Sequence, residues 1–392
     1  MTLPPALKSF VREHGQDDVH ELALHARQYP SIDMQLAIRQ ITGRKIAAEK
    51  IPSWYDNESV IYPKHISMEQ CSSEYTARYK ASLVAGDCMT DLTGGLGVDF
   101  SFMAPKFAKE AVYVEQQKEL SEIAAGNFDA LGLDNVIIKN ADAVDYLRMM
   151  PPTDLIYIDP SRRDNVGRKI FRIEDCTPNI LDIEDLLEEK AGMAMIKLSP
   201  MLDISLVLKS LRNISDVHVV SVDNECKELL FVKQKDCGKQ LIHCVNIQKD
   251  KADKFLLEKN QEEQAIARYA SSVGRYLYEP NVSLLKAGVY KYISAYYKLD
   301  KLHPSSHLYT SDEFLPDFQG RRFVVDSICS LNKKDIKSYL STIGHANITT
   351  RNFPLSVEEI RKRTKIKDGG TIYIFATTLS NEDKVLVLCR KT

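Results

Sequence analysis

The stretch Asp91-Leu92-Thr93-Gly94-Gly95-Leu96-Gly97-Val98-Asp99 decides the fold of this chain. The pattern predicts a short strand at its start, over residues 88–92, and a helix after it, over residues 100–109. The three glycines therefore lie on a strand-to-helix turn. Glycine there permits positive φ and lets a ligand approach the backbone, which any side chain would block. Such a turn fits either a dinucleotide or a nucleoside ligand.

Spacing and charge separate these two ligands. A dinucleotide fingerprint needs G-x-G-x-x-G, but when it is started at Gly95 the sixth position is Phe100, which is too bulky for close helix–strand packing. Asp91 and Asp99 would also repel a pyrophosphate. A ligand that carries an ammonium and a sulfonium group suits these two carboxylates better.

Strand and helix patterns alternate after the turn. This alternation predicts an α/β fold with a parallel sheet covered on both faces, and with ligands at the carboxyl ends of the strands. The last two strands follow one another closely enough to pair antiparallel at one edge. The expected strands span residues 88–92, 111–115, 136–139, 155–159, 194–198, 217–222, 229–233 and 240–247.

Carboxylates stand at the ends of three successive strands. Asp91 ends the first, Glu115 ends the second, and Asp142 follows the third. The two oxygens of Glu115 can accept hydrogen bonds from both hydroxyls of a ribose. Each carboxylate alone is as readily a solvated loop charge, because a strand end needs only turn formers. Together with the glycines, they predict a nucleotide-cofactor site.

The glycine turn resembles motif I of the class I S-adenosylmethionine methyltransferases, and Asn140-Ala141-Asp142-Ala143 resembles the short acidic motif that contacts adenine in that family. The resemblance implies a Rossmann-like methyltransferase sheet and S-adenosylmethionine as cofactor. Residues 68–83 form an expected helix whose polar side chains, Lys80 among them, either line the methionine end of the cofactor or face solvent. The resemblance implies these cofactor-binding residues: Asp91, Thr93, Gly94, Gly95, Gly97, Asp99, Glu115, Asp142 and Ala143.

The end of the fourth strand carries the expected catalytic residues, Asp159-Pro160-Ser161-Arg162-Arg163. They resemble motif IV of nucleic-acid methyltransferases, which holds an exocyclic base nitrogen near the methyl group while an aromatic residue stacks on the flipped base. Here Ser161 replaces a second proline and Arg162 stands where the aromatic residue would be. An arginine could stack on a base or bind a phosphate, or the arginine pair could cap the sheet through salt bridges.

Lys197-Leu198-Ser199-Pro200, after the fifth strand, is the expected opposite wall of the pocket. Neither this segment nor the Asp159 segment contains a cysteine, which disfavours attack on a pyrimidine ring by a cysteine nucleophile. Direct in-line methyl transfer, with good positioning and a proton acceptor, is the simpler expectation.

Composition limits the class of protein. A chain of 392 residues suggests two to four domains, and no apolar run approaches the ~20 residues that span a bilayer, so a cytoplasmic location is expected. The eight cysteines are scattered without a C-x-x-C pair and are expected to be reduced. No metal site is expected, because Pro304-Ser305-Ser306 between His303 and His307 indicates a loop.

Charge is distributed unevenly along the chain. Residues 321–392 hold 14 Lys and Arg against 7 Asp and Glu, whereas residues 1–320 hold 38 against 47. A basic module on an acidic chain predicts an anionic partner. The expected RNA-binding residues are Arg321, Arg322, Arg351, Arg361, Lys362, Arg363, Lys365 and Lys367.

Motifs in the C-terminal third resemble the bacterial class I methyltransferases with a THUMP-like C-terminal domain. They are Glu279-Pro280-Asn281, Leu284-Leu285-Lys286-Ala287-Gly288, Ser306-His307-Leu308-Tyr309-Thr310-Ser311 and Arg351-Asn352-Phe353-Pro354. In that family a small ferredoxin-like segment precedes the THUMP-like module, and THUMP domains in general bind RNA in tRNA-modifying enzymes. The implied fold is thus an α/β methyltransferase sheet with an N-terminal helical cap and α+β C-terminal modules.

The expected domains are an N-terminal helical cap (residues 1–66), a methyltransferase domain (67–248), a linker helix with a ferredoxin-like segment (249–320) and a basic THUMP-like domain (321–392). The expected function is S-adenosylmethionine-dependent methylation of a base in structured RNA, tRNA or rRNA, docked by the basic module, with no membrane partner. Two alternatives remain at this stage: a methyltransferase of a protein or small molecule, and a non-catalytic RNA-binding protein with a vestigial cofactor site.

Overall fold

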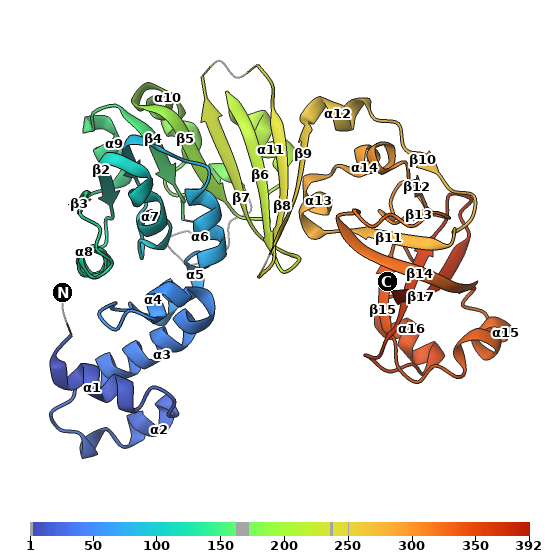
Figure 1. Cartoon of the computed structure of the whole chain (residues 1–392), viewed down its shortest axis with the longest axis horizontal. Coiled ribbons are helices and arrows are strands. Elements are labelled where there is room, and N and C mark those ends of the chain that lie inside the picture. The colour runs from blue at the N-terminus through green and yellow to red at the C-terminus, as the bar shows by residue number, and fades with distance from the viewer. Residues whose placement is uncertain (1–2, 162–171, 236–237, 250) are drawn as a thin grey trace. The chain divides into compact units, whose positions relative to one another are not determined.

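The computed structural model describes residues 3–161, 172–235, 238–249 and 251–392 (Figure 1). The chain divides into two compact units. Unit 1 comprises residues 1–217 and 227–240, and unit 2 comprises residues 218–226 and 241–392.

The N-terminal part of unit 1 is helical, as predicted. Its helices are α1 (Pro5–Glu13), α2 (Val19–Leu24), α3 (Met34–Lys50) and α4 (Pro52–Tyr55). Asp33 starts α3 because its side chain accepts a hydrogen bond from the Leu36 amide, which satisfies one of the free N–H groups of the first turn. Buried side chains such as Trp54 form one core with Val98 and Ile123, so the cap packs directly on the sheet domain.

The segment before the first strand is two helices instead of the single one predicted over residues 68–83. They are α5 (His65–Gln70) and α6 (Glu74–Ala81). The Ser73 side chain accepts a hydrogen bond from the Thr76 amide and so caps a new helix. The break places Ser72 in the interior, where it is 7% exposed.

The sheet of unit 1 confirms the α/β prediction. Its strands lie side by side in the order β3-β2-β1-β4-β5-β7, with the start of β6 next to β7. Neighbouring strands from β3 to β5 are parallel, and β5 and β7 are antiparallel. Parallel strands end at the same edge, so the predicted site residues at their carboxyl ends come together. The strands are β1 (Gly86–Asp91), β2 (Phe107–Val114), β3 (Val136–Lys139), β4 (Thr153–Ile158), β5 (Ala191–Leu198), β6 (Ile214–Val222) and β7 (Glu225–Gln234).

Helices α7 (Val98–Met103), α8 (Lys118–Ala130), α9 (Ala143–Met149), α10 (Ile180–Lys190) and α11 (Ile204–Ser210) alternate with the first six strands of unit 1. Helix α7 is shorter than predicted, because Pro105 lies in a short 3-10 turn (Ala104–Lys106) and β2 already begins at Phe107. The order of elements is otherwise the one that the sequence pattern predicts.

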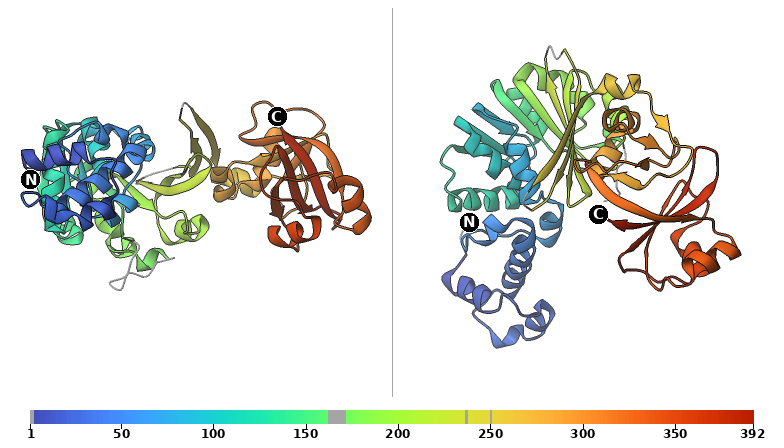
Figure 2. Two further views of the ribbon diagram at one scale, coloured as in Figure 1. Left: turned by 90° about the horizontal axis from the view of Figure 1, so that it is seen from below. Right: turned by 45° about the vertical axis from the view of Figure 1, so that its right-hand side comes forward.

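Unit 2 contains an antiparallel pair, β8 (Leu241–Ile247) and β9 (Ala252–Glu258), and a separate eight-stranded sheet, which Figure 2 shows from two further directions. The order in this sheet is β10-β12-β13-β11-β14-β17-β16-β15, and its first four strands are β10 (Arg268–Tyr269), β12 (Asp300–Lys301), β13 (Tyr309–Ser311) and β11 (Tyr276–Pro280). The C-terminal segment contains the other four strands of this sheet and one longer helix: β14 (Gly320–Cys329), β15 (Asn347–Arg351), α16 (Val357–Thr364), β16 (Ile372–Thr378) and β17 (Lys384–Lys391).

The prediction of a linker helix is wrong for its first half, which is the strand β9, and only the second half is a helix, α12 (Lys259–Gln264). In β9, Phe255 and Leu257 are buried and Leu256 is exposed, and this two-residue alternation outweighs the helix-prone composition. After β9 the unit contains two short helices, α13 (Val282–Ala287) and α14 (Tyr290–Tyr297), and Gly288, at φ +75°, ends the first of them.

The helices of the described part of the chain include none with the length and apolar character that a bilayer crossing requires. The cysteines described, seven in all, are free thiols: Cys71, Cys88, Cys176, Cys226, Cys244, Cys329 and Cys389.

Candidate functional site

The three glycines of the turn after β1 differ in what surrounds them. A Cβ on Gly94 would lie 2.0 Å from the Tyr113 ring, and one on Gly97, at φ +83°, would lie 2.6 Å from Phe128. These two glycines are therefore required by packing. Gly95 has φ +55°, and its Cβ would meet only a carbonyl oxygen 3.9 Å away. The close approach of a ligand that the sequence predicts is thus available at Gly95.

Glu115 faces the glycine turn from the end of β2. Its side chain accepts hydrogen bonds from the Gly95 amide at 2.9 Å and from the Gln117 amide at 2.7 Å, and it is 7% exposed. The Tyr113 hydroxyl donates to the Gly95 carbonyl in the same place. A carboxylate fixed in this way has its oxygens beside the open backbone of the turn, where hydroxyls of a ligand can be bound.

The end of β3 is joined to this region through Asn140, whose amide donates to the Glu115 carbonyl at 2.7 Å. Asp142 is exposed, and its carboxylate accepts hydrogen bonds from the Val144 and Asp145 amides at 2.8 and 3.1 Å. Asp142 therefore caps α9 in addition to any contact with a ligand.

Asp91 is buried at the end of β1, where its carboxylate accepts a hydrogen bond from the Thr93 amide at 2.9 Å. Burial raises the pKa of Asp91 well above its ordinary value, and the nearby carboxylates of Asp99, Asp159 and Glu115 raise it further. A positively charged ligand placed here would relieve this repulsion.

The ends of β1 and β4 are tied together. The Asp159 amide donates to the Thr93 hydroxyl at 2.7 Å, so the start of the predicted catalytic segment adjoins the glycine turn. Pro160 is buried, and Ser161 is exposed and paired through its backbone with Thr177. Arg162 and Arg163 lie outside the described residues.

A group of buried charged residues lies behind Asp159, and we call it the lysine–carboxylate cluster. The Lys80 ammonium lies 2.6 Å from Glu228 and 3.2 Å from Asp99. The Lys197 ammonium lies 2.6 Å from Asp159 and 3.6 Å from Asp99. The cluster comprises Lys80 from α6, Asp99 from α7, Asp159 after β4, Lys197 from β5 and Glu228 from β7.

Two hydroxyl groups complete the hydrogen bonding of this cluster. Ser72 donates to Asp99 at 2.7 Å and lies 3.3 Å from the Lys80 ammonium and 3.1 Å from the Lys197 ammonium. The Tyr157 hydroxyl also donates to Asp99 at 2.7 Å. Asp99, predicted to bind cofactor, thus accepts both hydrogen bonds on Oδ2, while its buried Oδ1 has no hydrogen-bond partner and lies 3.2 Å from the Lys80 ammonium.

The electrostatics of the cluster follow from burial and pairing. Burial alone would raise the pKa of Asp99, but the two lysines and the Tyr157 and Ser72 hydroxyls outweigh it and lower the pKa to about 2. Burial would lower the pKa of Lys197, but Asp159, Asp99 and Glu228 together raise it above its ordinary value. Lys197 is therefore a permanent cation beside Asp159.

The residues present fit a cationic nucleoside cofactor. The carboxyl groups of Asp91, Asp99, Glu115, Asp159 and Glu228 outnumber the two ammonium groups in this region, and the open backbone at Gly95 lies next to Glu115. Sequence reasoning placed Lys80 on a polar helix face and Lys197 on a pocket wall, but it missed Glu228. No local signal marked Glu228, because its partner Lys80 lies 148 positions earlier.

Several of the predicted RNA-binding arginines already form ion pairs or hydrogen bonds within unit 2. Arg321 and Arg351 both pair with Glu279, which is 3% exposed, through contacts of 2.6 and 2.7 Å. Arg361 pairs with Asp368 and also donates to backbone carbonyls. Arg322 donates to the Pro316 carbonyl. Among the predicted RNA-binding residues, four are exposed, and we call them the C-terminal cation group: Lys362, Arg363, Lys365 and Lys367.

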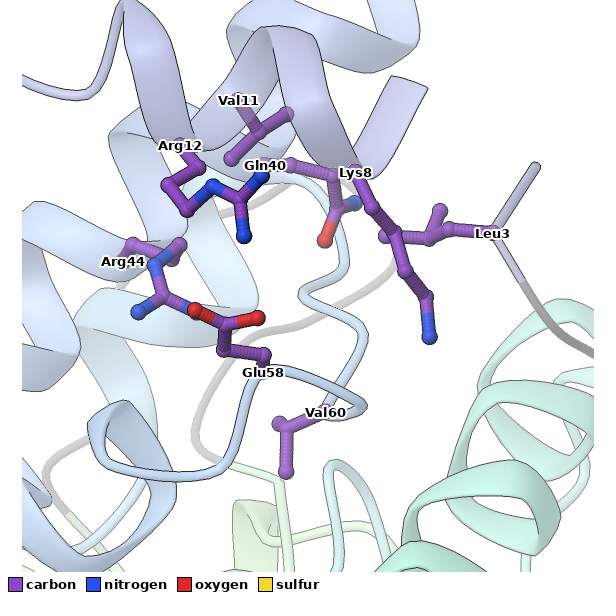
Figure 3. A pocket seen from close by; sticks show the side chains of 8 residues that line it. All are labelled: Leu3, Lys8, Val11, Arg12, Gln40, Arg44, Glu58 and Val60. Atoms are coloured by element: carbon purple, nitrogen blue, oxygen red, sulfur yellow. The ribbon is translucent and has the colours of Figure 1, made fainter. Parts of the chain in front are cut away.

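A hollow of the N-terminal cap, drawn in Figure 3, lies among α1, α3 and the segment that holds Glu58 and Val60. Three cationic side chains, Lys8, Arg12 and Arg44, and the carboxylate of Glu58 line it. None of its lining residues belongs to the predicted cofactor or catalytic sets.

Comparisons with known proteins show which domains and which relatives this chain resembles. Family models match as a ferredoxin-like domain over residues 276–318 and as a THUMP domain-like module over residues 320–391. An uncharacterised S-adenosylmethionine-dependent methyltransferase of Mycobacterium tuberculosis (strain ATCC 25618 / H37Rv) is 22% identical over 316 residues, which are 80% of this chain and 83% of the relative. A crystal structure assigned as a methyltransferase from Porphyromonas gingivalis W83 is 31% identical, covers 100% of both chains and superposes with a TM-score of 0.89.

Proposed function

Because this chain belongs to the S-adenosylmethionine-dependent methyltransferases that carry ferredoxin-like and THUMP-like C-terminal domains, we propose that it methylates structured RNA, tRNA or rRNA. Such a substrate would place the enzyme in the cytoplasm. The observation that carries the proposal is that the same chain has a cofactor site in unit 1 and the exposed C-terminal cation group in unit 2.

We assign cofactor binding to the turn and to the strand ends around it. In this assignment the open backbone at Gly95 contacts the cofactor, and Glu115 accepts hydrogen bonds from the ribose hydroxyls. The buried carboxylate of Asp91 attracts the positive charge of the cofactor. S-adenosylmethionine, when bound, supplies the methyl group. Asp142 and Ala143, at the start of α9, are the proposed contacts to adenine.

We assign acceptor positioning to the segment that begins at Asp159. This residue is fixed on one side by the Thr93 hydroxyl and on the other by Lys197. The sequence predicts a base as acceptor, and RNA also offers ribose hydroxyls.

We assign RNA docking to residues 321–392. Four exposed cations close in sequence can neutralise several phosphates, which lends binding energy to positioning the acceptor. The arginines paired with Glu279 support the sheet that presents this segment.

Transfer of labelled methyl groups tests the proposal. The full chain is incubated with methyl-labelled S-adenosylmethionine and, in parallel, with total RNA or total protein from cells that lack it. Label in RNA alone, with binding that weakens as salt rises, is the expected result. Label in protein alone, or in neither fraction, would exclude RNA as the substrate.

A further inference from the structure

Holding strands together with the lysine–carboxylate cluster has a large desolvation free energy. Lys80 is 0% exposed and Glu228 is 2% exposed, and desolvating two such ions costs several kcal/mol before their attraction is counted. Apolar side chains of similar volume would close the same space at no such cost. The arrangement therefore requires a reason beyond packing.

Exposure within the cluster rises from one end to the other. The Lys80 side chain is 0% exposed, the Lys197 side chain is 10% exposed and the Asp159 side chain is 35% exposed. Asp159 is also the member fixed to the glycine turn through Thr93. The cluster thus presents one ammonium and one carboxylate, 2.6 Å apart, where an acceptor would meet the methyl donor.

The pair at this open end matches the needs of a particular acceptor atom. A ring or exocyclic nitrogen of a base reacts through its lone pair or π system, and an aromatic side chain stacked on the base would position that nitrogen. Tyr157 cannot stack on a base, because it is buried and hydrogen-bonded to Asp99. A hydroxyl oxygen instead must lose its proton and bear negative charge as it reacts. A neighbouring carboxylate can take the proton, and a fixed ammonium can stabilise the charge.

We propose that the acceptor is a ribose 2′-hydroxyl of the RNA, held between the Lys197 ammonium and the Asp159 carboxylate. In the reaction the hydroxyl oxygen forms a bond to the methyl carbon while the carbon–sulfur bond breaks, and its electron pair stays on sulfur, which leaves as a neutral thioether. The hydroxyl proton passes to Asp159 and then to water. This inference rests on the proposed function and names the reacting atom.

Lys80 and Glu228 are positioning residues in this scheme. Glu228 holds the Lys80 ammonium, Lys80 and Lys197 share Asp99 and Ser72, and Lys197 holds Asp159. Each charge is thereby fixed before the substrate arrives, so little reorganisation is needed when negative charge develops on the hydroxyl oxygen.

The product identifies the acceptor atom. Total RNA from cells that lack the protein is incubated with the full chain and S-adenosylmethionine bearing a deuterated methyl group, and its nucleosides are fragmented by mass spectrometry. Label on the ribose fragment of a 2′-O-methylnucleoside is expected. Label on a base fragment would overturn this inference and leave RNA methylation intact, whereas absence of label from all RNA would remove both.

Two further measurements separate catalysis from structure. Lys197→Met should lower the methylation rate about 10²–10³-fold while cofactor and RNA dissociation constants stay within about twofold of those of the exposed control Lys118→Met. Once the modified nucleotide is known, a synthetic RNA with 2′-deoxyribose at that position should accept no methyl group. Methylation of that deoxy substrate would overturn the inference, whether or not the lysine variant folds.

Discussion

Lysines and arginines occur in both units of this chain, and one group in each unit differs from the other in burial and pairing. In unit 1, Lys80 and Lys197 are buried and each is paired with carboxylates. In unit 2, the C-terminal cation group is exposed. A buried, paired cation acts at short range on whatever atom is placed beside it, whereas an exposed cation acts through screened attraction to a partner. Local chemistry is therefore expected of unit 1, and docking of unit 2.

Removing one buried charge gives the largest expected effect. Lys80→Met would leave the buried Glu228 without its ammonium partner and Asp99 with Lys197 alone, 3.6 Å away. We expect a loss of about 3–5 kcal/mol in the free energy of unfolding, measured by urea denaturation. The control is Lys118→Met on α8, whose side chain is 80% exposed; it should change stability by less than about 0.5 kcal/mol.

A second substitution sharpens this comparison. The double variant Lys80→Met/Glu228→Gln removes both partners, so it should recover much of the stability lost by Lys80→Met alone. A Lys80→Met variant as stable as the Lys118→Met control would show that the cluster is not a coupled unit.

Glu115→Ala tests the cofactor role of unit 1. Loss of a charged acceptor for two hydroxyls should weaken S-adenosylmethionine binding about 10–100-fold in calorimetric titration, with RNA affinity unchanged. The matched control is Glu122→Ala on the exposed face of α8. Equal affinities of the two variants would contradict the placement of the cofactor at the glycine turn.

The docking role of unit 2 is tested by Lys362→Ala/Lys365→Ala. Because each phosphate contact contributes to salt dependence, the slope of log affinity for RNA against log salt should become shallower by about 1.5, with cofactor binding unaffected. The exposed pair Lys251→Ala/Lys254→Ala is the control. Identical slopes for the two double variants would remove the C-terminal cation group from the RNA interface.

The smallest expected effect concerns Asp91 and pH. The pKa of Asp91 is raised in the free protein, so Asp91 is protonated there at a higher pH than an ordinary aspartate. A bound cationic ligand instead favours the ionised form of Asp91. Cofactor binding should therefore release protons, and affinity should rise with pH by at most about tenfold per unit until Asp91 is ionised. Calorimetry in two buffers of different ionisation enthalpy measures the release, and Asp91→Asn should abolish it.

Sequence reasoning captured the parts of the site that are local in the chain. The glycine turn, the strand ends and the position of Glu115 follow from periodicity and turn chemistry within a few residues. The count of charged residues also showed the basic balance of residues 321–392. Both the α/β class and the THUMP-like module are confirmed.

The parts that could not be predicted depend on contacts between distant segments. Lys80 meets Glu228 only because α6 and β7 converge on the same sheet edge. Arg321 meets Glu279 because their strands pair, whereas Arg351 reaches the same carboxylate from the edge strand β15. Composition shows how many cations a segment has but not which of them are already paired. The break at Ser73 and the strand β9 were missed because capping and alternation there involve only a few residues.

Comparison of nucleosides from cells with and without this protein tests the central claim most directly. Purified tRNA and rRNA from both strains would be digested and every methylated nucleoside measured by mass spectrometry. We predict that one 2′-O-methylated nucleoside is missing without the protein, and that it returns with the unmodified chain but not with Lys197→Met. An unchanged set of methylated nucleosides would contradict the proposal that this site methylates RNA.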